Sequence, residues 1–200
     1  MKILILDNYD SFTYNLVHYI EEELGEAIDV YRNDEIDLDA VAAYDLIVLS
    51  PGPGLPAQAG IMPQLIQRYK GEKTIFGVCL GHQAIGEAFG ASLHNLAEVH
   101  HGIETDMQRT LDDDELFANV PRDFRAGRYH SWVIDPATLP DELEITATDA
   151  GGGIMALRHR EFPIFGVQFH PESIMTEHGR LMIRNLLNYV KARTATTSDV

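Results

Sequence analysis

Three short apolar runs in the first half of the chain limit what it can fold into. Residues 3–6, 46–49 and 74–78 consist of Ile, Leu, Val and Phe, apart from Thr74 and Gly77. Runs without polar alternation are typical of strands buried on both faces, as in parallel sheets. Helical patterns follow the first and third runs. This alternation of strand and helix predicts a parallel, doubly wound α/β sheet.

The helix expected after the first run has apolar residues at every fourth position from Phe12 to Leu24. We expect Ser11 to cap its amino end and Gly25 to end it. The other elements expected in this half are a strand at 28–31, a weak helix at 38–43 and a helix at 81–89.

The second half predicts shorter strands separated by Pro, Gly and Asp turns. These strands are expected at 125–130, 143–148, 154–159 and 165–169. A final helix is expected over 177–192, followed by a disordered tail at 194–200 that lacks apolar periodicity. No internal repeat or domain boundary is evident, so we expect residues 1–193 to form one domain.

Charge and cysteine content exclude several kinds of function. The formal net charge of −16 argues against binding to nucleic acid or to anionic membranes. The acidic runs at 21–23 and 112–115 are expected to be a solvated helix face and a turn. A single cysteine forms no intrachain disulfide and fits a reducing compartment. Without an evident signal peptide or membrane span, the sequence predicts a cytoplasmic protein.

Cys79 lies in the pattern G-x-C-x-G, between the third apolar run and the helix expected after it. A nucleophile at such a sharp strand-to-helix turn projects above the carboxyl ends of the strands, and the flanking glycines leave room for it. The helix amino end favours a thiolate. The backbone N–H of Leu80 is then placed to donate to an oxyanion. Cys79 is therefore the candidate nucleophile.

His170 and Glu172 follow the last expected strand in the segment Gln168–Ser173. Alternate residues of an extended segment share a face, so the carboxylate can orient the imidazole. The other imidazole nitrogen is then free to face a thiol, which is the arrangement of a catalytic triad. A third feature is the segment Ser50–Gly54, directly after the second run. Its glycines and prolines form a rigid platform that can present a backbone N–H to negative charge.

Taken together, these motifs resemble class I glutamine amidotransferases, which use a Cys-His-Glu triad. Within that family, the chain is similar to the small subunits of anthranilate synthase and aminodeoxychorismate synthase. The matching segments, in the family's order, are Asp7–Asn15, Leu49–Gly54, Gly77–Gln83, Arg128–Ser131 and Gly166–Ser173.

The resemblance implies a flavodoxin-like, mostly parallel sheet with a smaller antiparallel part from the second half. It implies that Cys79 attacks glutamine through a γ-glutamyl thioester, with His170 and Glu172 completing the triad. The oxyanion hole would be formed by the N–H groups of Gly52 and Leu80. Glutamine contacts would come from Gly52, Pro53, Gly54, Gln83, Ser131 and Trp132. The family commonly has Leu at the position of Trp132, which is a departure here.

By the same resemblance, ammonia would pass to a larger, chorismate-binding partner subunit. The sequence favours the anthranilate form, in tryptophan biosynthesis, on residues 60–63 and Tyr14. Aminodeoxychorismate synthesis, or one chain shared by both pathways, is the alternative. No cofactor is expected. No metal site is expected either, because the adjacent His100 and His101 lack further ligands at suitable spacing.

Two other classes of protein fit the sequence less well. An esterase-like cysteine hydrolase accounts for G-x-C-x-G but not for the order Cys, His, Glu along the chain. A non-catalytic binding subunit of the same fold accounts less well for the presence of all three triad candidates. For the segment Asp7–Asn15, we hypothesise that it braces the sheet end nearest the partner and helps to signal between subunits.

Overall fold

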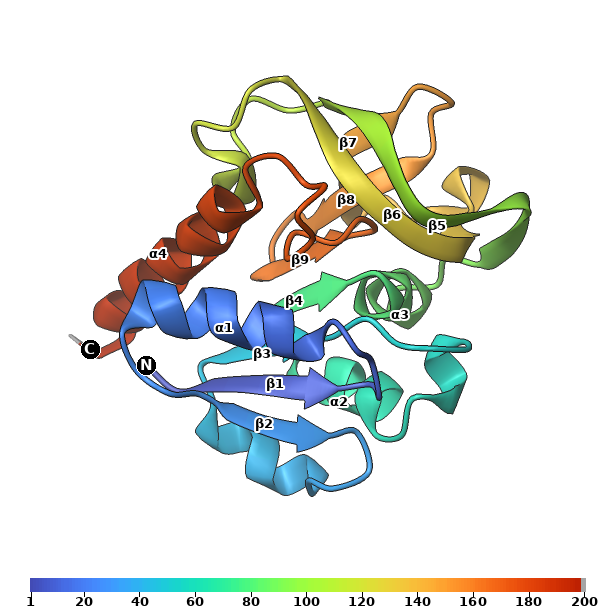
Figure 1. Ribbon diagram of the computed structural model, residues 1–200. Coiled ribbons are helices and arrows are strands. Elements are labelled where there is room, and N and C mark those ends of the chain that lie inside the picture. The colour runs from blue at the N-terminus through green and yellow to red at the C-terminus, as the bar shows by residue number, and fades with distance from the viewer. Residues whose placement is uncertain (199–200) are drawn as a thin grey trace.

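One mixed sheet runs through the whole molecule. The structure is a computed structural model and describes residues 1–198. Within these residues the strand order is β2-β1-β3-β4-β9-β8-β7-β5-β6 (Figure 1). The strands are β1 Ile3–Asp7, β2 Asp29–Arg32, β3 Leu46–Leu49, β4 Thr74–Val78, β5 Leu93–Arg109, β6 Asp123–Ile134, β7 Leu143–Asp149, β8 Ile154–His159 and β9 Ile164–Val167. The helices are α1 Thr13–Leu24, α2 Met62–Tyr69, α3 Leu80–Ala88 and α4 Gly179–Ser198, with short 3₁₀ turns η1 Leu38–Ala43, η2 Pro56–Gln58, η3 Glu115–Phe117 and η4 Pro136–Thr138.

The parallel part of the sheet contains β2, β1, β3, β4 and β9. Ile3 and Ile5 belong to one core cluster, with α1 and α4, whereas Leu4 and Leu6 belong to a second cluster, with α2 and α3. Successive strand residues point to opposite faces, so a strand covered on both faces is apolar throughout. The predicted doubly wound, flavodoxin-like sheet is therefore confirmed.

The antiparallel part consists of β8, β7, β5 and β6. It includes a long β5–β6 hairpin that lies above the parallel strands in Figure 1. Strand β5 was not predicted from the sequence, because most of its 17 residues are exposed and it shows no apolar alternation. Helix α2 was not predicted either, although Met62, Leu65, Ile66 and Tyr69 are buried at helical spacing.

The start of α1 differs from the prediction that Ser11 caps it. The helix begins at Thr13, and the N-cap residue, Phe12, makes no side-chain hydrogen bond to the helix terminus. Instead, Asp10 Oδ2 accepts from the Phe12 N–H at 2.8 Å, and Asp7 Oδ1 accepts from the Thr13 hydroxyl at 2.8 Å. The Asp10 carboxylate thus accepts from a backbone N–H at the helix start, as was expected of the Ser11 hydroxyl, and the Asp7 carboxylate binds the Thr13 side chain. Gly25 does end the helix, with φ 76°.

The end of α4 extends into the tail predicted at 194–200. The helix continues through Ser198, so residues 194–198 are helical, while 199–200 lie outside the described residues. Hydroxyl groups of Thr194 and Thr196 donate to carbonyls one turn earlier, at 3.0 Å each, and Ala residues nearby favour helix. No helix in the described part of the chain is long and apolar enough to cross a membrane.

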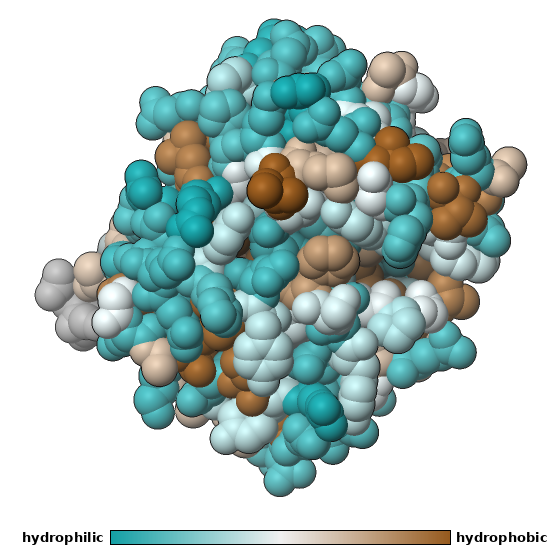
Figure 2. Space-filling model, in the orientation of Figure 1, coloured by the Kyte–Doolittle hydropathy of each residue, from teal (hydrophilic) through white to brown (hydrophobic). Residues whose placement is uncertain are grey.

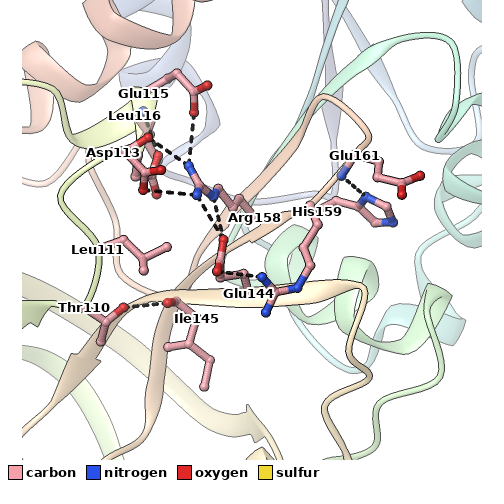
Figure 3. A network of polar contacts seen from close by, with 12 residues as sticks. Thr110, Leu111, Asp113, Glu115, Leu116, Glu144, Ile145, Arg158, His159 and Glu161 are labelled. Carbon is pink, nitrogen blue, oxygen red and sulfur yellow. Dashed lines mark hydrogen bonds and ion pairs between the residues drawn. The ribbon is translucent and has the colours of Figure 1, made fainter.

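Residues of both acidic runs form ion pairs and are not simply solvated. Glu22 and Glu23 of α1 form ion pairs with Arg180 and Arg184 of α4. In the second run, Asp113 and Glu115 pair with Arg158 of β8. Figure 3 shows Arg158 between these two residues and Glu144 of β7, which also binds Arg160.

Asp114, in the middle of that second run, is buried, and burial raises the pKa of its carboxyl group. Its Oδ1 accepts from the Leu116 N–H at 2.9 Å. The segment around η3 is therefore fastened to the antiparallel strands and is not a free turn.

Candidate active site

Cys79 occupies the sharp turn between β4 and α3. Its backbone has φ 52° and ψ −101°, a region that residues other than glycine rarely adopt. The two flanking glycines are required by close packing. A Cβ on Gly77 would lie 2.5 Å from the Gly81 carbonyl, and one on Gly81 would lie 2.5 Å from the Leu49 carbonyl oxygen. The strained turn expected from the sequence is present.

His170 and Glu172 form a buried pair in the loop after β9. Nδ1 of His170 lies 2.6 Å from Oε1 of Glu172, and because a carboxylate only accepts, Nδ1 is the donor. The other ring nitrogen, Nε2, is buried without a hydrogen-bond partner among the described residues. Burial alone would lower the pKa of His170, but the Cys79 sulfur and the Glu172 carboxylate outweigh it and raise the pKa to about 10. The site therefore favours an imidazolium beside the sulfur.

Two aromatic rings fix the plane of the His170 imidazole. Phe12, from the start of α1, and Tyr129, from β6, meet it edge-on with centroids 5.2 Å and 4.8 Å away. They also contact each other, at 4.9 Å. The backbone is held as well, since the His170 N–H donates to the Gly127 carbonyl at 3.1 Å. The base is thus oriented by two parts of the chain that are distant from it in sequence, the start of α1 and β6.

The Ser50–Gly54 loop is braced by the residue that follows β1. Asn8 donates from its backbone N–H to Ser50 Oγ and from Nδ2 to the Ser50 carbonyl, both at 2.8 Å. Asn33 in turn donates to Asn8 Oδ1 at 3.0 Å. A Cβ on Gly52 would lie 2.5 Å from the Asn8 carbonyl oxygen, so this close approach requires glycine. The Asp7–Asn15 segment therefore supports both the loop, through Asn8, and the base, through Phe12.

A cavity of about 260 Å³ opens beside Cys79. It brings together all six residues expected to contact glutamine, namely Gly52, Pro53, Gly54, Gln83, Ser131 and Trp132. The other residues that line the cavity were not predicted from the sequence motifs. They are Val99, His100, His101, Tyr129 and His130. Leu80 is buried at the first position of α3, next to Cys79. A larger cavity of about 660 Å³, around Asp106 and Asp149, contains neither cysteine nor histidine.

One wall of the smaller cavity contains a histidine with a fixed tautomer. Arg128 can only donate, and its Nε lies 3.0 Å from His130 Nε2, so the proton of His130 is on Nδ1. That Nδ1–H faces the Trp132 carbonyl at 3.0 Å. Burial and the Arg128 charge lower the pKa of His130 to about 3. Arg128 itself is buried and paired with Asp149 at 2.9 Å. His130 therefore lines the cavity as a neutral side chain and is a poor proton acceptor.

Among the described residues, no group of three or more His, Cys, Asp or Glu side chains could hold a metal ion. What remains is a thiol, an oriented imidazole–carboxylate pair and a glycine loop around one cavity. Such an arrangement can perform acyl transfer through a covalent intermediate.

Residues 4–189 match the family described as glutamine amidotransferase class-I. The chain belongs to this family. It is 48% identical to anthranilate synthase component 2 of Azospirillum brasilense over 93% of this chain and 95% of that protein. It is 46% identical to aminodeoxychorismate/anthranilate synthase component 2 of Bacillus subtilis, over 92% and 95%. Other relatives are multifunctional proteins, of which the chain spans 25% to 51%.

Among solved structures, the amidotransferase chain resembles a putative GMP synthase protein from Thermoplasma acidophilum. The TM-score is 0.87 with 26% identity, over 99% of this chain and 98% of the other. The fold and the family predicted from the sequence motifs are thus confirmed, and the chain is a glutamine amidotransferase enzyme.

Proposed function

We propose that this amidotransferase is the glutaminase subunit of an anthranilate synthase, with Cys79 as nucleophile, His170 as base and Glu172 as its orienting group. The observation that carries the assignment is the strained Cys79 turn beside the buried His170–Glu172 pair. The thiol proton passes to His170 Nε2, which leaves a thiolate facing the cavity.

Attack of the thiolate on the side-chain amide carbon of glutamine forms the carbon–sulfur bond and moves charge to the amide oxygen. The backbone N–H groups of Gly52 and Leu80 would donate to this oxygen. The imidazolium of His170 then gives its proton to the departing nitrogen, and ammonia leaves a γ-glutamyl thioester. Next, His170 Nε2 takes a proton from water, the hydroxide attacks the thioester, and the returned proton releases glutamate and free thiol.

The ammonia would be used by a second subunit that binds chorismate. The name component 2, which the Azospirillum and Bacillus relatives carry, supports a separate synthase component. Exposed apolar side chains, of which Val99 lines the cavity, support a docking surface. We call Tyr9, Tyr14, Val99, Ile103 and Ile174 the apolar rim. Figure 2 shows brown hydrophobic groups in the middle and right of this face, near the β5–β6 hairpin of Figure 1.

Contacts link the elements that carry the apolar rim. Phe12, before Tyr14, touches Tyr129, and the position of Gly102, before Ile103, lies against Tyr129 and Met175. Ile174, beside Met175, is 98% exposed. Isolated apolar side chains are common on protein surfaces, but a group of them on linked elements is typical of an interaction site. A cytoplasmic location is part of the same proposal, because Cys79 must stay reduced.

The test is an assay of the chain together with its synthase component, glutamine and chorismate. Fluorescent anthranilate should form, and both Cys79→Ser and His170→Asn should lower glutamine-dependent formation by about 10³-fold or more. Ammonium salts should restore product in both variants, because they bypass the glutaminase. The exposed His94→Asn variant is the matched control and should remain active.

The product decides between the two pathways. The Bacillus relative's name covers both anthranilate and aminodeoxychorismate synthesis. Aminodeoxychorismate without anthranilate in this assay would move the assignment to p-aminobenzoate synthesis. Full glutamine-dependent activity of His170→Asn would rule out the proposed triad.

A further inference from the structure

The sulfur of Cys79 has a second polar neighbour besides the triad. Gln168, two residues before His170, is fully buried, and its Nε2 lies 3.6 Å from Cys79 Sγ. It leaves the end of β9, the strand that pairs with β4 just before the Cys79 turn. A buried side-chain amide beside a reactive sulfur could present either its donor or its acceptor, and the two choices have opposite effects on a thiolate.

The surrounding hydrogen bonds decide which end of the Gln168 amide faces the sulfur. Gln83 lies 2.8 Å from the Trp132 carbonyl oxygen, which only accepts, so the Gln83 atom there must be its NH₂ group. The same NH₂ lies 3.2 Å from the Gln168 side chain, which must therefore present its oxygen. The remaining Gln168 group, its NH₂, then points at Cys79 Sγ. The Trp132 carbonyl thus fixes the orientation of the Gln83 amide and, through it, that of the Gln168 amide.

We propose that Gln168 is a further catalytic residue, which donates an N–H to the Cys79 sulfur and holds it as a thiolate, with Gln83 keeping that donor in place. This proposal rests on the proposed function only in taking Cys79 as the nucleophile. The thiol proton still passes to His170, and Gln168 keeps its own protons throughout. As the carbon–sulfur bond forms, charge leaves the sulfur and the Gln168 hydrogen bond weakens.

This role predicts a specific dependence on pH. A donor to the thiolate increases the thiolate fraction where the thiol would otherwise stay protonated. It does not help where the thiolate is already complete, because the same hydrogen bond also reduces the nucleophilicity of the sulfur. Loss of the donor should therefore slow the reaction of Cys79 on the acid side of its pH profile and leave it equal or faster at high pH.

Other titratable groups lie on the elements packed around Cys79, and the variants below leave all of them in place. They are His82 on α3, His100 and His101 on β5, Tyr129 and His130 on β6, His170 and Glu172 after β9, and Asp10 before α1. A change in the profile on replacing Gln168 alone is then due to the amide.

The experiment is alkylation of Cys79 by iodoacetamide across pH, without glutamine, so it reports on the thiol and not on turnover. Gln168→Met, which removes the donor at similar size, should lower the rate on the acid side of the profile by about tenfold, as expected for a hydrogen bond to a charged group. Its profile should move to higher pH and meet the wild-type curve at the alkaline end. The matched control is Gln108→Met, an exposed glutamine on β5, which should leave the profile unchanged.

A uniform loss of rate at every pH, or an unmoved profile, would overturn the proposal and leave Gln168 a packing residue. If Gln168→Met does not fold, NMR of the unaltered chain decides. The side-chain amide signal of Gln168 should shift with pH in step with the alkylation profile, and Cys79→Ser should abolish this shift. An amide signal that ignores the ionisation of Cys79 would also overturn it. Failure of the glutaminase assay with a normal alkylation result would instead count against the proposed function.

Discussion

At the scale of single residues, the site is governed by how Cys79 and His170 share one proton. The pKa of His170 is raised to about 10 although burial opposes its charge, because the sulfur and Glu172 lie beside it. His130, which lines the cavity beside Cys79, has a pKa lowered to about 3, because it is buried beside Arg128. These two buried histidines thus differ in charge state, and only His170 can supply a proton near neutral pH.

This difference can be measured by NMR titration of the histidine rings. Wild-type His170 should stay protonated well above neutral pH, and Cys79→Ser should lower its pKa, because the sulfur that raises this pKa is gone while burial remains. His130 is the internal control and should not titrate between pH 5 and 10 in either protein. A His170 that titrates alike in both proteins would show that the sulfur does not raise its pKa.

The same scale sets the limit of what could be predicted. The G-x-C-x-G pattern after an apolar run predicted the Cys79 turn, because strand, turn and helix are all local in sequence. Nothing local indicates that Gln168 faces the sulfur, since its orientation depends on Gln83 and a Trp132 carbonyl far along the chain. Phe12 likewise meets His170 only through the fold.

At the scale of elements, two connections hold the site in shape. The segment after β1 braces the Ser50–Gly54 loop through Asn8, and the start of α1 places Phe12 on His170. Sequence alone predicted the β1 and α1 elements that flank this segment, but not the contacts. It missed β5 because an exposed, polar hairpin strand gains its stability from pairing with β6 and not from an apolar face.

The brace predicts a particular defect in Asn8→Ala. The variant loses the bond from Nδ2 to the Ser50 carbonyl and the one that Asn8 Oδ1 accepts from Asn33, and it keeps the backbone N–H bond to Ser50 Oγ. The loop should then move away from the position that would serve the oxyanion, and kcat should fall by about tenfold to a hundredfold. The KM for glutamine should change less, because the other cavity residues stay in place. Steady-state glutaminase kinetics measure both. Asn15→Ala, an exposed asparagine of α1, is the control, and an equal effect in the two variants would argue against the brace.

A second element-scale prediction concerns Arg158, which fastens the η3 segment to β7 and β8 (Figure 3). Arg158→Met should lower the free energy of unfolding by about 2 kcal/mol, because several charged hydrogen bonds of a largely buried guanidinium are lost. Urea unfolding measures this change, and hydrogen exchange should rise at residues 113–117. Arg160→Met removes an exposed pair to the same Glu144 and should cost less than about 1 kcal/mol.

At the scale of the whole molecule, the fold gathers chemistry at one edge of the sheet. Parallel strands β1, β3, β4 and β9 end together, and the segments that follow them supply Asn8, the Ser50–Gly54 loop, Cys79 and His170. The β5–β6 hairpin closes the cavity from the antiparallel side. Ligands bind at this edge in open α/β sheets because the strand order and loops leave a crevice there.

The apolar rim at this edge gives the last prediction. If the synthase component docks there, Ile174→Ser should weaken its binding by about tenfold, which is typical of one well-buried apolar contact in an interface. Ile174 is fully outside the core, so the fold of the free subunit should not change. Calorimetric titration with the synthase component measures the affinity, and thermal unfolding of the subunit checks the fold. Tyr31→Ser removes an exposed apolar side chain from β2, outside the rim, and should bind as wild type. Equal binding of both variants would place the interface away from Ile174, and equal weakening would show that exposed apolar area in general, not the rim, attracts the partner.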